Sequence, residues 1–428
     1  MQIIGNNALK SKTKLDTGLH NHDEAASAAE VVTESADGAK SLTLKKAVSL
    51  ETFVFLVLFF AFFSYLGMRM GVANMLNTMM NTGYQLLLNT VFYIMAIAVL
   101  TGAVAGLFSE FGVISLINKL LSPLIRPIYG LPGAATLGIL ATYLSDNPAI
   151  LTLAEDKNFR RYFKKYQLPA LTNIGTAFGM GLIITTFIIG LGAITGSGEN
   201  YVKAALVGNI GAIVGSIVST RLMLLKTKHL YGTEALAIDD LQGKQSGEEI
   251  PEGMRAVRSG NVGGRFIESM LEGGKNGVSM GLAIVPGVLI ICTAVLMLTN
   301  GPSAQGSYTG AAYEGVALLP FLADKIDFIL NPLFGFSSAE AIAVPITALG
   351  AAGAAIGLIP GLITSGFAGG NDVAVFTAIC MCWSGYLSTH VAMMDSLHYR
   401  ELTGHAILSH TIGGLCAGIA AHYIFILL

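Results

Sequence analysis

The sequence predicts an all-α polytopic membrane protein with about seven transmembrane helices, two re-entrant hairpins and two amphipathic interfacial helices, arranged as an inverted repeat. Three observations lead to this prediction. Of the 428 residues, 53% are hydrophobic and only 12% are charged, which is more apolar than a soluble chain of this length requires. Apolar segments long enough to cross a bilayer recur along the chain. Two copies of one pattern also lie 205 residues apart.

Seven apolar segments of about 20 residues or more are expected to cross the membrane as helices. They cover residues 51–72, 83–108, 168–191, 204–225, 278–298, 373–394 and 404–428. The predicted organisation is a flexible cytoplasmic tail, an extra N-terminal helix, a first repeat, a cytoplasmic loop and a second repeat. These parts cover residues 1–45, 46–82, 83–225, 226–275 and 276–428 in that order.

A different pattern separates the second crossing from the third. Apolar residues recur at helical spacing from Val113 to Leu124, with Lys119 and Ser122 off that stripe. A helix of this kind is expected to lie along the membrane surface. It should end near Pro127 and Gly130. The apolar segment after it, 133–144, would be only about 18 Å long as a helix, too short to cross.

A polar interruption follows this short segment, at Ser145, Asp146, Asn147 and Pro148. The next apolar segment is again short and runs into the charged stretch 155–165, which must be in water. Two half-helices with a polar tip between them form a re-entrant hairpin. Asn147 suits the N-cap and Pro148 the first helical position, so a helix should begin there.

The same pattern returns 205 residues later. Pro127 and Gly130 fall on Pro332 and Gly335, after a second helix with the same apolar stripe. The second hairpin should run from residue 338 to about 365, with a glycine- and alanine-rich tip at 350–357 and an exit loop at 366–372. One tip therefore carries polar side chains, and the other offers mainly backbone.

Basic residues indicate the topology, because cytoplasmic loops are enriched in Lys and Arg. Lys45 and Lys46, the stretch 160–165 and the loop 226–275 are all basic and can be cytoplasmic together. The N-terminus would then be cytoplasmic. Three crossings separate the two hairpins, which puts the second on the opposite face and inverts the repeat. Inverted repeats with broken helices are the architecture of secondary transporters.

This order of elements resembles the core of concentrative nucleoside transporters. It is equally similar to the nucleoside-recognition or Gate-domain membrane proteins, which include spore maturation proteins and the membrane region of bacterial ferrous-iron permeases. The segments that carry the resemblance are Leu131–Ala134, Ser145–Ala149 and Ser365–Asp372. The resemblance begins near residue 83, and it implies a transporter or permease of a bacterial inner membrane.

In nucleoside transporters the hairpin tips and the helices after them contact nucleoside, and a sodium ion lies near the first tip. The resemblance therefore implies that Ser145, Asp146, Asn147 and Asn173 bind a solute. It also implies a cation site at Asp146 and Asn147 with the hydroxyls of Thr172 and Thr176. The alternative reading is that the tip residues only cap helix ends. Small polar residues also pack ordinary membrane helices.

The crossing at 373–394 is unusually polar for its place. Ser384 and Ser388 are further candidate solute contacts, and His390 is a candidate proton relay, because an ionisable group inside the membrane is costly. Cys380 and Cys382 near this histidine could suit a soft metal, which keeps an iron-type permease open as an alternative. Ordinary core packing is the other reading.

The function expected from the sequence is secondary transport of a small polar solute by alternating access at the two tips. The expected partners are that solute and the lipid bilayer, while nucleic acid is not expected and a homo-oligomer is left open. No resident cofactor or metal and no catalytic residue is predicted, and Na+ and H+ are both considered as coupling ions. A non-transporting scaffold is the remaining alternative.

Overall fold

The computed structural model describes residues 30–31, 42–43, 46–145, 148–155, 157–237, 257–303 and 305–428. The chain divides into two compact units, Met1–Ser64 and Tyr65–Leu428. Most of the predicted tail lies outside the described residues. Within that tail, β1 (Glu30–Val31) pairs antiparallel with β2 (Leu42–Thr43).

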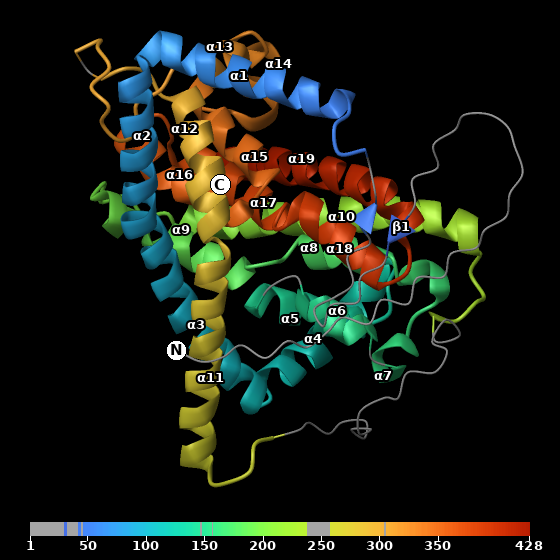
Figure 1. Ribbon diagram of the computed structural model, residues 1–428. Helices are drawn as coiled ribbons and strands as arrows, with labels where there is room; N and C mark the ends of the chain where they lie inside the picture. Colours follow the sequence, from blue (N-terminus) through green and yellow to red (C-terminus); the bar gives the residue numbers. More distant parts are fainter. Residues whose placement is uncertain are drawn as a thin grey trace, which may run out of the picture. The chain divides into compact units, whose positions relative to one another are not determined.

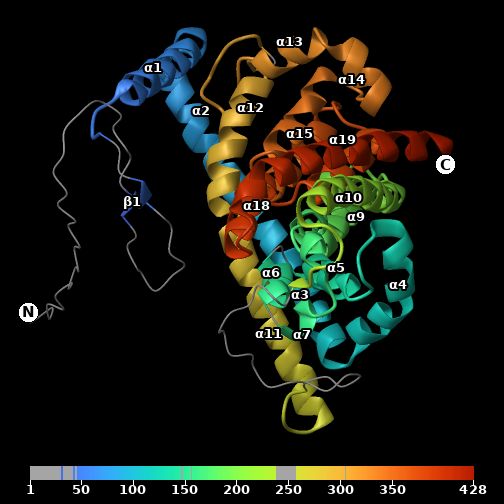
Figure 2. The same cartoon turned by 90° about the vertical axis from the view of Figure 1, so that its right-hand side faces the viewer.

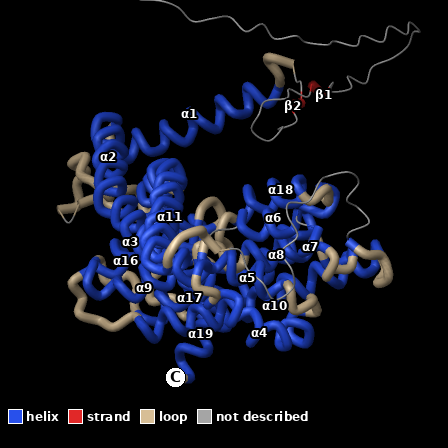
Figure 3. Tube along the Cα trace, turned by 90° about the horizontal axis from the view of Figure 1, so that it is seen from below, coloured by secondary structure: helices blue, strands red, loops and turns tan. Residues whose placement is uncertain are grey.

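The described residues are otherwise almost wholly helical, as Figures 1 and 3 show. Two of the elements, η1 and η4, are π-helices, and η2, η5 and η6 are 3-10 helices. In chain order the elements are α1 (Leu50–Met70), α2 (Val72–Gln85), η1 (Leu86–Val91), α3 (Phe92–Glu110), α4 (Val113–Tyr129), α5 (Ala135–Leu144), α6 (Pro148–Glu155), α7 (Lys157–Arg160), η2 (Lys165–Gln167), α8 (Ala170–Thr176), α9 (Gly181–Thr195), α10 (Val202–Tyr231), α11 (Val262–Ala283), η4 (Gly287–Cys292), α12 (Thr293–Thr299), α13 (Leu318–Asp324), α14 (Asp327–Phe334), η5 (Ala339–Ile342), α15 (Ala343–Ala348), α16 (Ala352–Thr364), α17 (Gly370–Cys382), α18 (Tyr386–Ser396), η6 (Arg400–Leu402) and α19 (Thr403–Leu427).

Within the described residues, six helical stretches are long and apolar enough to cross a membrane. A seventh results when α14 and the η5–α15 segment, which bend by 79° at their break, are counted as one span. The predicted fold class is therefore confirmed: the chain is an all-helical, multi-pass membrane protein. The six spans are Leu50–Met70, Val72–Glu110, Lys165–Thr195, Val202–Tyr231, Val262–Thr299 and Arg400–Leu427.

Three segments differ from the expected helices. The range 73–82, which separates the first two expected crossings, is occupied by α2, which continues through η1 into α3. The crossing expected at 373–394 is two helices, α17 and α18, because Gly385 takes a left-handed conformation with φ 66°. The second tip is also shorter than expected. Residues 352–357 already belong to α16, so the break is confined to 349–351.

Both interfacial helices are present. α4 ends at Gly130, whose φ of 78° is the left-handed conformation that commonly terminates a helix. Leu116, Leu120 and Leu124 on its apolar stripe are 59%, 66% and 51% exposed, as expected for a surface that meets lipid. The second copy is split into α13 and α14, which end at Gly335 with φ 60°.

The repeat also appears in the backbone. Gly130 and Gly335, both left-handed, are 205 residues apart, and so are the left-handed Met180 and Gly385. The second pair marks a break in each of two corresponding helices, between α8 and α9 and between α17 and α18. A positive φ is uncommon for a residue with a side chain such as Met180. The strained position therefore indicates that the break is required by the surrounding structure.

Part of the buried core lies where α10, α17 and α19 pack together. α10 and α19 run side by side in the view of Figure 2. Small residues permit this close approach: a Cβ added to Gly211 or Gly215 of α10 would lie 2.6 Å or 2.5 Å from a backbone oxygen of α19. Membrane helices commonly associate through such small residues, since water exclusion drives little association within lipid.

The loop between α12 and α13 is held by one carboxylate. Glu314, 5% exposed, accepts hydrogen bonds from the backbone N–H groups of Thr309 and Gly310, each at 3.0 Å. Burial raises the pKa of Glu314, but the hydrogen bonds from Thr309 and Gly310 outweigh it and hold the pKa below its usual range. Helix α2 also contacts this loop. The side-chain amide of Asn74 donates to the carbonyl of Tyr308, and that of Asn81 donates to the carbonyl of Gly310. The ionised glutamate therefore organises the loop that α2 contacts.

Candidate functional site

The first hairpin has the predicted form. α5 ends at Leu144, Ser145 follows as an exposed residue outside the helix, and α6 begins at Pro148, the predicted helix start. Asp146 and Asn147, predicted to bind the solute and a cation, lie outside the described residues. Their roles stay predictions.

A cavity of about 300 Å³ lies beside this hairpin. Ser145 and Ala149 line it from the hairpin, and α3 and α11 line it with small residues. Several polar side chains also face this volume. They are Thr101, Ser109, Arg258, Ser269, Glu272 and Asn276. The cavity therefore combines an apolar wall with hydrogen-bonding groups, as small-molecule sites usually do.

An ionic cluster lies at the edge of this cavity. Glu110, with a side chain 3% exposed, accepts from Arg258 Nη1 at 2.6 Å and from Arg265 Nε at 2.7 Å. Arg258 also pairs with Glu272 on α11. These contacts join the end of α3 to the chain just before α11 and to α11 itself. The cluster thus closes one side of the cavity with charged groups.

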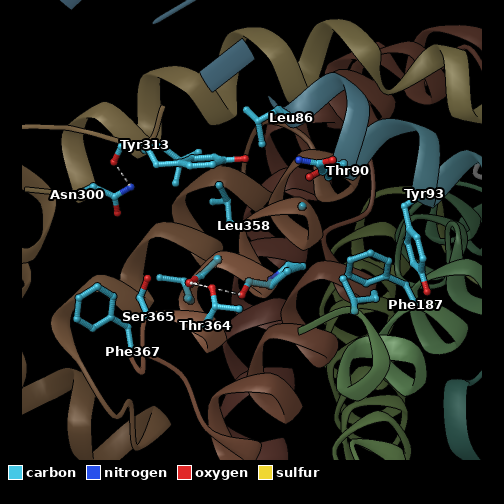
Figure 4. A pocket seen from close by; sticks show the side chains of 17 residues that line it. Leu86, Thr90, Tyr93, Phe187, Asn300, Tyr313, Leu358, Thr364, Ser365 and Phe367 are labelled. Carbon is cyan, nitrogen blue, oxygen red and sulfur yellow. Dashed lines mark hydrogen bonds between the residues drawn. The ribbon is translucent and has the colours of Figure 1, made fainter. Parts of the chain in front are cut away.

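A second cavity, of about 290 Å³, lies beside the second hairpin (Figure 4). Asn300 and Tyr313 line one end and Tyr93 and Phe187 the other, while α16 and the residues after it form the hairpin side. The π-helix η1 contributes Leu86 and Thr90, and π-helical turns are frequently found at functional sites. Each hairpin therefore has its own cavity.

The predicted residues Thr172 and Asn173 belong to a buried polar network on α8. Asn173 Nδ2 donates to Ser219 Oγ on α10 at 2.9 Å and to the carbonyl of Ala406 on α19 at 3.0 Å. Thr172 Oγ1 donates to Pro169 O at 2.8 Å and contacts Asn173 Oδ1 at 3.3 Å. Thr176 Oγ1 donates to Thr172 O at 2.6 Å. The amide of Asn173 thus connects three helices.

The network continues to two histidines. Ser219 Oγ lies 2.8 Å from His410 Nδ1, and the other nitrogen of His410 contacts the carbonyl of Cys382. The ring centroids of His410 and His390 are 4.6 Å apart. The structure therefore brings Asn173 and the predicted His390 into one buried assembly, although neither residue lines either cavity.

Of the remaining candidates, Ser384 is buried in the break between α17 and α18, and the side chain of Ser388 lies outside the described residues. Cys380 and Cys382 are fully buried in α17. Within the described part of the chain, no group of three or more His, Cys, Asp or Glu side chains could hold a metal ion. Sequence reasoning assigned no role to Ser219 or His410. The run of small residues on α10 gave no sign of a polar role, and His410 is linked to Ser219 across 191 residues.

No family model matches the chain. An uncharacterised protein of Alkalihalophilus pseudofirmus is 23% identical over 231 residues, which cover 52% of this chain and 46% of the relative. The chain thus matches about half the length of that curated relative.

Among solved structures, a variant of CNTnw, a concentrative nucleoside transporter, in an outward-facing state is similar with a TM-score of 0.50 and 12% identity, covering 79% of this chain and 76% of that chain. CNTnw in an inward-facing, substrate-bound state is similar with a TM-score of 0.49 and 14% identity, covering 79% of this chain and 75% of that chain. The chain therefore has a fold similar to that of the concentrative nucleoside transporters.

Proposed function

We propose that this protein is a secondary transporter for a small polar solute, with alternating access at the two hairpins. The observation that carries the proposal is the pair of similar cavities, about 300 Å³ and 290 Å³, one beside each hairpin. Alternating access requires a binding region that two halves of the fold can expose in turn. The fold likeness to an outward-facing CNTnw variant supports the same function.

A nucleoside-like solute is the first class to test. The cavity at the second hairpin offers aromatic rings from Tyr93, Phe187 and Tyr313 beside the amides of Asn89 and Asn300. Aromatic faces stack on a planar base, and amides and hydroxyls bond to polar edges of a ligand. At the first hairpin, Ser145 and the predicted contacts Asp146 and Asn147 would supply further polar groups. Asn173, also predicted to bind the solute, lines neither cavity and would act by holding α8 against α10 and α19. Thr172 and Thr176 stay predicted ligands of a cation, which the sodium gradient in the uptake assay tests.

The test is uptake by proteoliposomes that contain the purified full chain. Labelled nucleosides, nucleobases and organic acids are offered with a sodium gradient, with a proton gradient or with neither. Accumulation of one class above empty liposomes is expected. Asp146→Ala should reduce it about tenfold or more, since a hydrogen bond to a charged group contributes ~1.5–3 kcal/mol.

Asp324→Ala is the matched control, because Asp324 is an exposed carboxylate on α13. Its uptake should equal that of the unmodified chain. Absence of uptake for every solute class would contradict the proposed function. If Asp146→Ala transported normally, the solute site would have to be placed elsewhere.

A further inference from the structure

Two buried histidines face each other behind the hairpins. His390 comes from α18 and His410 from α19, both are 0% exposed, and their ring centroids are 4.6 Å apart. Titratable side chains at such depth are expensive and usually functional. The two cavities described above do not include either residue.

The hydrogen bonds determine where the protons are on these rings. His390 Nδ1 lies 2.6 Å from the carbonyl of Tyr386, and a carbonyl can only accept, so Nδ1 carries the proton. His410 Nε2 likewise donates to the carbonyl of Cys382. The Nδ1 of His410 is then an acceptor, and it receives the hydroxyl proton of Ser219, whose oxygen is already bonded by Asn173.

One ring nitrogen of the histidine pair takes no part in these hydrogen bonds. His390 Nε2 is buried and has no hydrogen-bond partner among the described residues. With Nδ1 protonated, Nε2 presents a free lone pair, which is the basic site of a neutral imidazole. An unsatisfied buried acceptor costs about 1–3 kcal/mol. The fold therefore keeps a proton acceptor at this position although an apolar side chain would pack without that cost.

We propose that His390 Nε2 binds one proton, and that this proton is the ion coupled to the transport proposed above, on which this inference rests. Hydronium supplies the proton: its O–H bond breaks as the N–H bond of His390 forms, and on release the N–H bond breaks and the proton returns to water. Because the rings are so close and both nitrogens of His410 are engaged, the pair holds one added charge and not two.

The surroundings of His390 favour the neutral form while the helices are packed. The titratable groups whose rings lie against that of His390 are His410 of α19 and Tyr386 on α18 itself. α8 carries no ionisable side chain. The charged residues on the other neighbouring elements are the exposed Arg400 and Glu401 of η6, the exposed Asp395 of α18, and Glu155 of α6, whose side chain lies outside the described residues.

A buried imidazolium without a nearby counter-charge is strongly disfavoured. The proton therefore binds when α18 separates from α19 and water reaches Nε2 from one side of the membrane. It stays bound while access changes to the other side, and it leaves there before the helices pack again. The break between α17 and α18 provides a place for this movement, since Gly385 has a left-handed conformation that glycine adopts at no steric cost. Proton binding and helix movement are thus linked.

The single tryptophan of the chain is a built-in reporter. Trp383 lies in the same break, donates its ring N–H to the carbonyl of His410 at 3.1 Å, and has its ring centroid 5.4 Å from that of Tyr386. Its fluorescence emission in the purified full chain should change in one single-proton transition below about pH 6.5, the value of a free imidazole, because the packed helices favour the neutral ring. The transition should be absent in both His390→Gln and His390→Asn.

His405→Gln is the matched control, because His405 is an exposed histidine on the same helix as His410. It should leave the transition unchanged. Emission that does not change with pH in the unmodified chain would overturn the proposal whatever the variants do. A transition that persists in a folded His390 variant would overturn it as well.

Uptake assays separate this proposal from the proposed function. If the proton is the coupled ion, an inward proton gradient should drive solute accumulation, a sodium gradient should not, and His390→Gln should abolish the response. Uptake that depends on sodium alone would overturn the inference and leave transport intact. An emission transition lost in His390→Gln without uptake of any solute would support the proton site and contradict the transport function.

Discussion

Replacing Gly273 by alanine should push α3 and α11 apart and destabilise the fold. A Cβ at this position would lie 2.1 Å from the carbonyl oxygen of Gly102, a distance that real Cβ contacts do not reach. The backbones themselves would have to move, because no flexible side chain is present at the contact. Overpacking of this kind costs about 1–3 kcal/mol, and more where the backbone cannot yield. Thermal unfolding in detergent measures the effect.

Gly274→Ala is the matched control for this experiment. Gly274 is the neighbouring residue on the same helix, but an added Cβ there would meet Val99 at 3.5 Å, an ordinary van der Waals contact. Both variants change helix propensity equally. A stable Gly273→Ala protein, with unfolding equal to that of Gly274→Ala, would contradict the close crossing of α3 and α11.

The same crossing affects the cavity at the first hairpin. Gly102, Gly106, Gly273 and Gly277 all line that cavity. Any separation of α3 and α11 therefore also changes the volume offered to a solute. Gly273→Ala should consequently impair uptake even where the protein remains folded.

Asn173→Ala should lower the free energy of unfolding by on the order of 2–3 kcal/mol, because it removes the donor shared by Ser219 and Ala406. Ser219→Ala should also destabilise, since His410 Nδ1 then loses its donor. The two effects should not add. A double-mutant cycle should give a coupling energy between about 0.5 and 3 kcal/mol, as expected for residues in one buried network.

Asn118→Ala is the control for this cycle. Asn118 is a partly exposed residue on α4 whose amide contacts Ser122 at 3.3 Å. Its replacement should change stability by less than about 0.5 kcal/mol. Strict additivity of the Asn173 and Ser219 variants would show that the network does not act as a unit.

Local patterns predicted much of the fold. The apolar stripe from Val113 to Leu124 became α4, and Pro148 begins α6 as its preference for the first helical turn indicated. The break at Gly385 escaped notice, because a glycine in an apolar segment is compatible with a continuous membrane helix. Nothing in the sequence indicated that Met180 would take a left-handed conformation, since a residue with a side chain adopts it only where the surrounding structure requires it.

The candidate site was less predictable than the fold. His390 could be selected by its charge alone, as an ionisable residue inside an apolar segment. The contact of His390 with His410 could not be predicted, because the two rings meet only through the packing of α18 on α19. The link from Asn173 to Ser219 spans 46 residues and depends on how α8 packs against α10. Periodicity within one helix contains no information about such contacts.

Alternating access is the central claim, and thiol labelling from each side of the membrane tests it most directly. Ser145→Cys and Ala351→Cys place one thiol at each hairpin break, in a Cys416→Ser background, because the other three native cysteines are buried. We expect a membrane-impermeant reagent to reach the two positions from opposite sides, and the transported solute to change the two labelling rates in opposite directions. Labelling of both positions from one side, with rates that no solute or ion gradient alters, would contradict alternating access at the two hairpins.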